Sequence, residues 1–154
     1  MNHSILFVCL GNICRSPMAE GAMRAAGEDR GAALVVDSAG TGSWHIGDPP
    51  DRRAQAAAMA NGVDISGQRA RQIVAADFDR FDRIVAMDRS VFADVQALRP
   101  KAARGAISLL LDHVPGREGQ DVVDPYYGGE NGFLEVWSDV AEGAEALLAK
   151  IARA

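Results

Sequence analysis

Residues 5–17 read Ile-Leu-Phe-Val-Cys-Leu-Gly-Asn-Ile-Cys-Arg-Ser-Pro. The four apolar residues at the start predict a buried strand that ends at Cys9, because strands covered on both faces are continuously apolar. Ser16 is expected as the N-cap of a following helix and Pro17 as its first residue, since both residue types favour those positions. The sequence therefore begins with a strand, a short loop and a helix.

The loop of this unit is suited to binding an anion. Gly11 and Asn12 stand where positive φ is expected, which lets the backbone N–H groups converge on one point in front of the helix N-terminus. Arg15 offers a planar guanidinium that matches two oxygens of a phosphate. The same positive charge favours the thiolate form of Cys9. We therefore expect a catalytic anion-binding loop and not a buried structural cysteine.

Composition limits the classes of protein to which this chain can belong. Its 154 residues, 48% hydrophobic and 24% charged, are typical of one globular domain. A net charge of −5 argues against general nucleic-acid binding. The sequence contains neither an apolar run as long as a membrane span, about 18 residues, nor the basic and apolar regions of a signal peptide. We expect one domain over residues 1–154, in the cytoplasm, with no nucleic-acid or membrane partner.

The hydrophobic pattern alternates between strands and helices along the chain. Strands are predicted over residues 4–9, 33–38, 81–87 and 107–111, and helices over 17–28, 51–61, 89–98 and 133–153. Gly-rich loops are expected over 40–50 and 115–131. Strands separated by helices form a parallel sheet in α/β layers. Ligands of such sheets bind at the carboxyl ends of the strands, and Cys9 stands at one of them.

The two cysteines lie in the same loop, where a disulfide between them would close too small a ring to staple the fold. Cys14 has two interpretations, a redox neighbour of the nucleophile or a residue that packs inward, and both stay open. His3, His45 and His113 are scattered without the spacing of metal ligands. We expect neither a metal nor another cofactor.

The loop at residues 8–17 resembles the signature of the low-molecular-weight protein tyrosine phosphatases. Further matches follow in order at residues 37–41, 44, 47–50, 70–72, 82, 87–88 and 124–127, so that the resemblance covers residues 5–127. It implies a four-stranded parallel sheet flanked by helices on both faces, with the phosphate-binding loop after the first strand. It also implies metal-independent, two-step hydrolysis of phosphotyrosine or aryl phosphates.

Hydrolysis of a phosphomonoester needs a nucleophile, stabilisation of the phosphoryl oxygens and a proton for the leaving group. Cys9 would be the nucleophile and would carry a phosphocysteine. Asp124 matches the family's general acid and would later act as general base for water. Ser16 would hydrogen-bond the Cys9 sulfur, and the alternative that it only caps the helix stays open. The phosphate-binding set would be Leu10, Gly11, Asn12, Ile13, Cys14 and Arg15, with Asn12 also holding the left-handed turn.

Three aromatic residues in the loops are candidate walls for a flat substrate ring, namely Trp44, Tyr126 and Tyr127. One position departs from the family pattern. Gln68 stands where members often carry a His that helps to hold the loop asparagine, and glutamine can donate and accept a hydrogen bond but cannot titrate.

Two other functions share parts of this pattern. A thioredoxin-coupled arsenate reductase needs further cysteines to relay a disulfide, and the sequence has none after Cys14. A catalytically silent phosphotyrosine-binding module would be expected to lose Cys9, Arg15 or Asp124, and all three are present. We therefore expect a phosphatase that acts as a monomer or weak dimer on a phosphotyrosine-bearing protein, for which a tyrosine kinase is one candidate.

Overall fold

The computed structural model describes residues 3–153, with the exception of the Glu130 side chain. The elements are β1 (His3–Cys9), α1 (Arg15–Asp29), β2 (Leu34–Gly40), α2 (Arg52–Met59), α3 (Asp77–Arg80), β3 (Arg83–Ala86), α4 (Arg89–Leu98), β4 (Ala106–Leu109), the 3-10 helix η1 (Leu110–His113) and α5 (Glu130–Ala152). The four strands form one parallel sheet in the order β2-β1-β3-β4.

β1 lies inside the sheet and is buried on both faces. It pairs with β2 over its whole length, from His3 opposite Leu34 to Cys9 opposite Gly40, and with β3 on its other side. Because successive side chains of a strand point to opposite faces, Phe7 packs in the cluster beneath α1 and α5, whereas Leu6 packs in the cluster beneath α3 and α4. This explains why the first strand reads as an uninterrupted apolar run.

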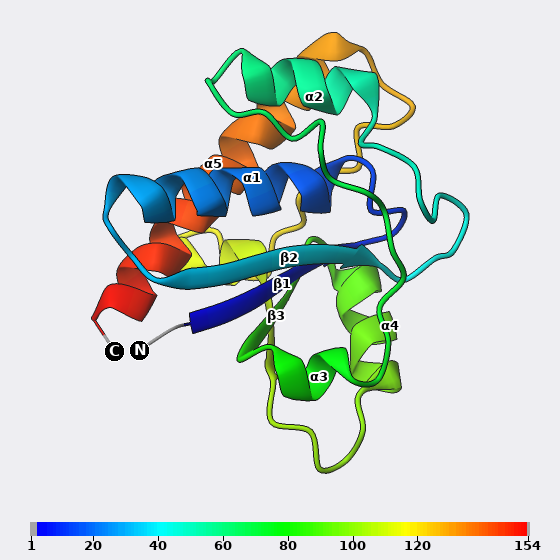
Figure 1. The fold of residues 1–154 in the computed structure, drawn as a ribbon, viewed down its shortest axis with the longest axis vertical. Coiled ribbons are helices and arrows are strands. Elements are labelled where there is room, and N and C mark those ends of the chain that lie inside the picture. The colour runs from blue at the N-terminus through cyan, green and yellow to red at the C-terminus, as the bar shows by residue number, and fades with distance from the viewer. Residues whose placement is uncertain (1–2, 154) are drawn as a thin grey trace.

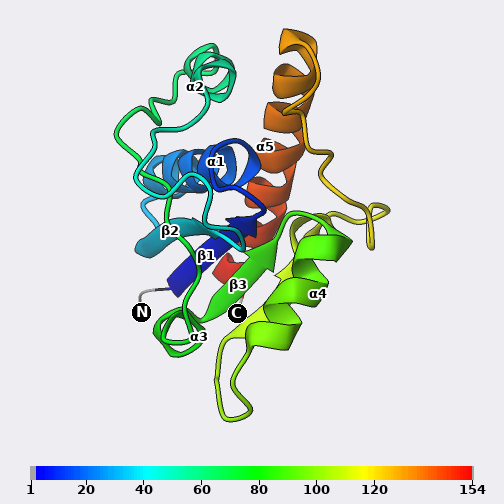
Figure 2. The same ribbon diagram turned by 90° about the vertical axis from the view of Figure 1, so that its right-hand side faces the viewer.

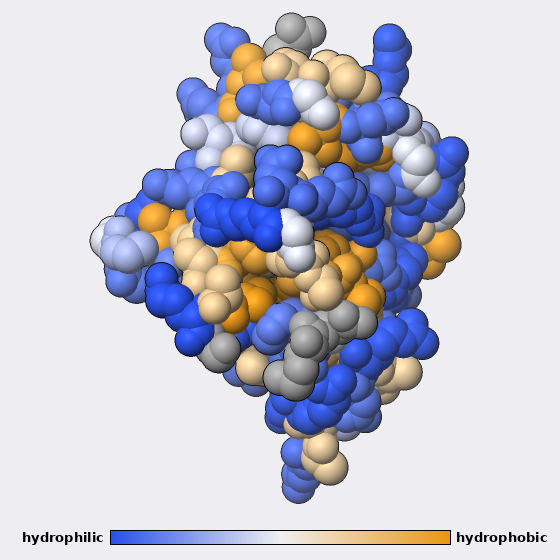
Figure 3. Space-filling model, turned by 60° about the vertical axis from the view of Figure 1, so that its left-hand side comes forward, coloured by the Kyte–Doolittle hydropathy of each residue, from blue (hydrophilic) through white to orange (hydrophobic). Residues whose placement is uncertain are grey.

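Helices cover both faces of the sheet, as expected. α1 and α5 pack against one another on one face with α2 beyond them, and α4 lies against β3 and β4 on the other (Figures 1 and 2). The carboxyl ends of the strands point to the right in Figure 1, away from the ends of the chain. Figure 3 brings forward the left-hand side of Figure 1, where the ends of the chain lie, and shows apolar residues gathered near the middle of a largely hydrophilic face. Within the described residues, no helix is both long and apolar enough to cross a membrane.

Two short elements differ from the sequence-based expectations. The strand predicted over residues 107–111 ends at Leu109, where the carboxylate of Asp112 accepts a hydrogen bond from the Leu109 backbone N–H and the chain turns into η1. α3 was not predicted, because four residues carry no helical pattern. Its first residue, Asp77, is buried, and its carboxylate accepts hydrogen bonds from the backbone N–H of Val74 and from the side chain of Arg71.

Candidate active site

The loop after β1 wraps around the sulfur of Cys9, and we call residues 9–16 the phosphate loop. The Cys9 Sγ lies 3.0 Å from the Ser16 Oγ and accepts a hydrogen bond from the Asn12 backbone N–H at 3.3 Å. Asn12 has a φ of 57°, the left-handed conformation that the sequence predicted for it. The turn therefore brings backbone and side-chain donors to the thiol.

Asn12 is the centre of a buried hydrogen-bond network. Its side-chain NH2 donates to the Ser16 Oγ at 2.8 Å and to the Ser38 Oγ at 3.0 Å, and its Oδ1 accepts from the backbone N–H of Arg71 at 3.0 Å. Ser38 in turn donates to Glu20 Oε1 at 2.7 Å. Burial raises the pKa of Glu20, and the hydrogen bond from Ser38 opposes that rise. The network fixes the loop from behind, so Asn12 supports the thiol and does not line the cavity.

Gln68 lies outside this network. Its Nε2 donates to the backbone carbonyl of Pro17 at 3.1 Å, and its Oε1 is buried without a partner among the described residues. The loop asparagine is held instead by Ser38 and by the backbone of Arg71. In this chain, position 68 therefore contacts the first turn of α1 and not Asn12.

The start of α1 differs from the expectation. The helix begins at Arg15, its N-cap position is Cys14, and no side chain caps it. The expectation that Ser16 caps the helix and that Pro17 is its first residue was wrong, because the Ser16 hydroxyl is occupied by Cys9 and Asn12. Gly11 also does not adopt positive φ, which in this loop is confined to Asn12.

A different glycine is needed for the loop to pack against the sheet. Gly40 ends β2 opposite Cys9, and a Cβ at this position would lie 2.8 Å from the carbonyl oxygen of Leu10. The absence of a side chain lets the backbone of β2 approach the loop closely. The phosphate loop therefore depends on the neighbouring strand for its position.

Arg15 is buried and held by two partners from distant parts of the chain. Its Nη1 donates to Asp88 Oδ2 at 2.6 Å and to the carbonyl oxygen of Val122 at 2.8 Å. Burial alone would lower the pKa of Arg15, but the negative charges of Cys9 and Asp88 raise it above its usual value. Asp88, which follows β3 at the carboxyl edge of the sheet, was not among the expected site residues.

Asp124 also lies beside the Arg15 guanidinium. Its Oδ2 lies 3.7 Å from Arg15 Nη2, and its Oδ1 accepts a hydrogen bond from the backbone N–H of Tyr126 at 3.1 Å. The Asp124 side chain is 44% exposed, whereas that of Arg15 is 3% exposed. The carboxylate therefore faces solvent while the guanidinium forms the floor beneath it.

These groups surround one cavity of about 330 Å³, lined by Cys9, Leu10, Gly11, Ile13, Cys14, Arg15, Trp44, His45, Asp124, Tyr126 and Tyr127. The three expected aromatic walls are among the lining residues. Asn12 and Ser16 belong to the loop, but their side chains bond on its far side and neither residue lines the cavity. His45 was missed, because a lone histidine in a Gly- and Pro-rich loop gives no signal for a particular site.

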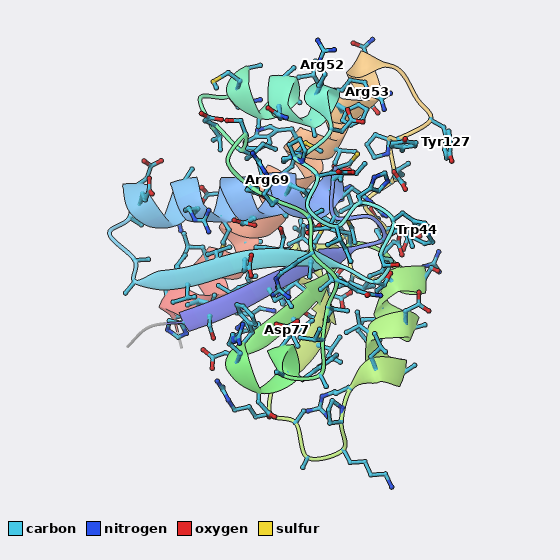
Figure 4. The ribbon with its side chains drawn as sticks, turned by 45° about the vertical axis from the view of Figure 1, so that its right-hand side comes forward. Trp44, Arg52, Arg53, Arg69, Asp77 and Tyr127 are labelled. Carbon is cyan, nitrogen blue, oxygen red and sulfur yellow. The ribbon has the colours of Figure 1, made fainter. Side chains whose placement is uncertain are left out.

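The aromatic walls stand at the mouth of the cavity. Trp44 is 70% exposed, and its indole packs closely over Gly42, where a Cβ would lie 1.9 Å from the ring. Tyr126 and Tyr127 meet edge to face with ring centroids 5.0 Å apart. Trp44 and Tyr127 lie at the same end of the molecule in Figure 4. Together with Trp44, the two tyrosines line the cavity that also contains Cys9.

The floor of the cavity provides donors for an anion. Within residues 3–153, the backbone N–H groups of Leu10, Gly11, Ile13 and Cys14 donate to no other atom. They are therefore available to a bound oxyanion, together with the Arg15 guanidinium. No group of His, Cys, Asp and Glu residues in the described part of the chain is arranged to hold a metal ion.

Cys14 is buried at the edge of this floor, 5% exposed. Burial, followed by the nearby carboxylate of Asp51, raises the pKa of the Cys14 thiol far above its usual value. At neutral pH, Cys14 is therefore a protonated thiol. The structure thus gives the two cysteines of the loop different surroundings.

A cysteine loop with free backbone donors, at the carboxyl edge of a four-stranded parallel sheet, defines a class of tyrosine phosphatases. The model of the low molecular weight phosphotyrosine protein phosphatases matches residues 4–154, and the chain belongs to this family. It is accordingly a protein-tyrosine-phosphatase, a hydrolase whose substrates are phosphotyrosine-containing proteins.

Known members are similar over almost the whole chain. The chain is 43% identical to the low molecular weight protein-tyrosine-phosphatase YfkJ of Bacillus subtilis, covering 96% of this chain and 95% of that protein. It is 39% identical to the human low molecular weight phosphotyrosine protein phosphatase, covering 96% and 94%. The crystal structure of a tyrosine phosphatase from Entamoeba histolytica superposes with a TM-score of 0.92 at 35% identity, covering 98% and 97%. That of a Drosophila arginine phosphatase has a TM-score of 0.89 at 34% identity, covering 96% of each chain.

Proposed function

We propose that this chain hydrolyses phosphotyrosine through a phosphocysteine on Cys9, with Arg15 binding the phosphoryl group and Asp124 moving the proton. The observation that carries this proposal is that Asp124, distant in sequence, lines the same cavity as Cys9 and Arg15. The Asn12 backbone N–H donates to the Cys9 sulfur at 3.3 Å, and the planar guanidinium of Arg15 matches two phosphoryl oxygens.

In the first step, the Cys9 sulfur attacks the phosphorus and the bond from phosphorus to the tyrosine oxygen breaks. Asp124 gives its proton to that oxygen, so that a neutral phenol leaves. The backbone N–H groups of the phosphate loop and Arg15 stabilise the equatorial oxygens, whose charge is greatest in the transition state.

In the second step, Asp124 takes a proton from water, whose oxygen attacks the phosphorus. The P–S bond breaks and inorganic phosphate leaves, which restores the thiolate and the protonated carboxyl group. Ser16, 3.0 Å from the sulfur, is placed to donate a hydrogen bond to the departing thiolate. This role fits its position better than helix capping does.

We expect the cavity to accept the phenyl ring of a phosphotyrosine side chain. Leu10, Ile13 and Trp44 give the cavity apolar walls, which suit a phenyl ring better than the polar guanidinium that an arginine phosphatase such as the Drosophila relative would have to accept. A competition assay between a phosphotyrosine peptide and a phosphoarginine peptide tests this preference. Faster turnover of phosphoarginine would contradict it.

The protein partner remains part of the proposal. A phosphotyrosine-bearing tyrosine kinase is one candidate, and we propose that the enzyme acts on it as a monomer or weak dimer. Two unpaired thiols, both in the phosphate loop, suit a reducing compartment such as the cytoplasm.

The decisive experiment is hydrolysis of p-nitrophenyl phosphate by the wild type and by Cys9→Ser, with a chelator present. The wild type is expected to retain full activity with the chelator, because its own residues supply both nucleophile and charge stabilisation. Cys9→Ser is expected to lose activity by roughly 10⁴-fold or more while keeping the circular dichroism spectrum of the wild type. Substantial turnover by a folded Cys9→Ser variant would refute the proposal.

A further inference from the structure

The segment that carries Asp124 has little structure of its own. Residues 123–129, which we call the acid segment, lie between Val122 and the start of α5 and form neither helix nor strand. Within the segment, the Tyr126 N–H donates to Asp124 and the Gly128 N–H donates to the carbonyl of Pro125. Such a segment needs outside contacts to keep Asp124 over the cavity.

Arg53, near the start of α2, supplies those contacts. Its Nη2 donates to the carbonyl oxygen of Tyr126 at 3.0 Å, and its Nη1 donates to that of Gly128 at 3.1 Å. Its guanidinium carbon also lies 5.7 Å from the centre of the Tyr126 ring and 4.5 Å from that of Phe133 in α5. Within the part of the chain that the structure describes, the other hydrogen bond to the acid segment comes from its continuation into α5, where the Gly132 N–H donates to the carbonyl oxygen of Gly129 at 3.1 Å.

The same arginine is fixed to the phosphate loop through its neighbour. Asp51 Oδ1 accepts from Arg53 Nε at 3.1 Å and Asp51 Oδ2 accepts from Nη2 at 3.0 Å, a two-point ion pair in which the Asp51 side chain is 13% exposed. The backbone N–H of Asp51 donates to the carbonyl oxygen of Ile13 at 2.8 Å. An uninterrupted path of bonds therefore runs from the phosphate loop through Asp51 and Arg53 to the acid segment.

We propose that Arg53 is a positioning residue that sets the distance between the general acid and the phosphate loop. This inference rests on the proposed function of Asp124. Arg53 is not among the residues that line the cavity. It acts through Tyr126. The carbonyl oxygen of Tyr126 accepts a hydrogen bond from Arg53, and its backbone N–H donates one to the Asp124 carboxylate. Figure 4 shows Arg53 on α2, above the end of the molecule where Trp44 and Tyr127 lie.

The test compares kcat/KM for two substrates that differ in their need for an acid. Phenolate is a poor leaving group and needs a proton, whereas p-nitrophenolate leaves without one. Arg53→Gln is expected to lower kcat/KM for phenyl phosphate about tenfold, which is less than the roughly 10²-fold or more that loss of a general acid costs, and to leave p-nitrophenyl phosphate nearly unchanged. Arg53→Lys is expected to lie between, because an ammonium group cannot hold both carbonyls and Asp51 in one plane.

Arg52→Gln is the matched control. Arg52 is the adjacent residue of α2, carries the same charge and is exposed. Its replacement removes one positive charge near the site without touching the contacts to the acid segment. The ratio of the two kcat/KM values is expected to stay at the wild-type value in this variant. A change as large as that of Arg53→Gln would show that charge alone is responsible, and would overturn the proposal.

A double-mutant cycle separates this inference from the proposed function. If Asp124→Asn by itself lowers kcat/KM equally for phenyl phosphate and p-nitrophenyl phosphate, Asp124 is not the acid and the proposed function fails. If Asp124→Asn lowers kcat/KM more for phenyl phosphate than for p-nitrophenyl phosphate, Arg53→Gln is expected to leave the ratio of the two values unchanged in the Asp124→Asn background. Arg53 acts through the Asp124 carboxylate, which that background lacks. Additive discrimination would overturn the role of Arg53 alone.

Amide hydrogen exchange gives a readout that is independent of catalysis. Arg53→Gln is expected to speed exchange in residues 123–129 while leaving residues 3–9 protected as in the wild type. Unchanged exchange in the acid segment would overturn the inference, whatever the role of Asp124. A uniform rise across the whole chain would show a merely structural effect and would overturn it as well.

Discussion

The phosphate loop and the acid segment face the same cavity but are held in different ways. Cys9, Arg15 and Ser16 are at most 3% exposed, and the loop is bonded to β2, to Asp51 ahead of α2 and to Asp88 ahead of α4. In the acid segment, the Asp124 side chain is 44% exposed and Tyr127 is 96% exposed. The group that must match a fixed phosphate geometry is built into the core, whereas the group that meets varied leaving groups lies at the surface.

This comparison predicts that substitutions in the two regions differ in kind. A change in the phosphate loop removes core contacts and disturbs stability and rate together. A change in the acid segment removes few contacts and affects the rate on some substrates more than on others.

The largest effect is expected from Arg15→Lys. Lysine cannot keep the contacts to Asp88 and Val122 and also bind two phosphoryl oxygens, so kcat/KM should fall by about 10²–10³-fold. The loss should be the same for phenyl and p-nitrophenyl phosphate, because the phosphoryl group is common to both. Steady-state kinetics measure it, and a loss below tenfold would place the main charge stabilisation elsewhere.

Asp124→Asn should cost rate without stability. We expect about a 10²-fold loss of kcat/KM on phenyl phosphate and a clearly smaller loss on p-nitrophenyl phosphate. Because the side chain is half exposed, the midpoint of thermal unfolding should stay at the wild-type value. A marked fall in that midpoint would remove the contrast between the two regions.

Asn12→Ala should have the opposite pattern, with its main effect on the free energy of unfolding. The side chain is buried and bonded to Ser16, Ser38 and the Arg71 backbone, and alanine is poorly suited to a φ of 57°. Unpaired buried groups and backbone strain together should lower the free energy of unfolding by about 2–4 kcal/mol. Denaturant unfolding measures this loss, with Asp124→Asn as the comparison. Equal stability of the two variants would contradict the prediction.

Cys14→Ser should have the smallest effect on basal activity, because its buried thiol is not the nucleophile. Under mild peroxide, Cys9 sulfenic acid can react with the Cys14 thiol to give a disulfide and water. The wild type should then show a mass two hydrogens lower and should recover with dithiothreitol, whereas Cys14→Ser should recover less. Equal recovery, with only sulfinic acid at Cys9, would show that Cys14 is a packing residue.

The first part of the chain was largely predictable, because its signals are local. An apolar run, an asparagine suited to left-handed backbone and an arginine after the loop identify β1, the turn and the anion site within residues 5–17. The start of α1 could not be predicted in the same way. The Ser16 hydroxyl bonds to the Cys9 sulfur and not to the backbone of the first helical turn. Sequence cannot show which of two possible partners a hydroxyl takes.

The contacts that complete the site were beyond sequence reasoning for a related reason. Asp88 and Arg53 belong to different elements from the residues they hold. Asp88 lies within the matched positions 87–88, but the match assigned it no contact, and Arg53 lies in no matched position. Asp124 was found only through the resemblance, since one carboxylate in an acidic chain carries no signal alone. Geometry between distant segments is set by the packing of the sheet and helices, which no local pattern encodes.

The placement of the chain ends has a practical consequence. The amino end of β1 and the last turn of α5 lie at the end of the molecule opposite Trp44 and the carboxyl end of β1 (Figures 1 and 4). A tag, a surface anchor or a fused fluorescent protein attached at either end therefore points away from the cavity mouth. Immobilised enzyme should present its cavity to the solution, so that captured phosphoproteins of any size can approach without hindrance from the support.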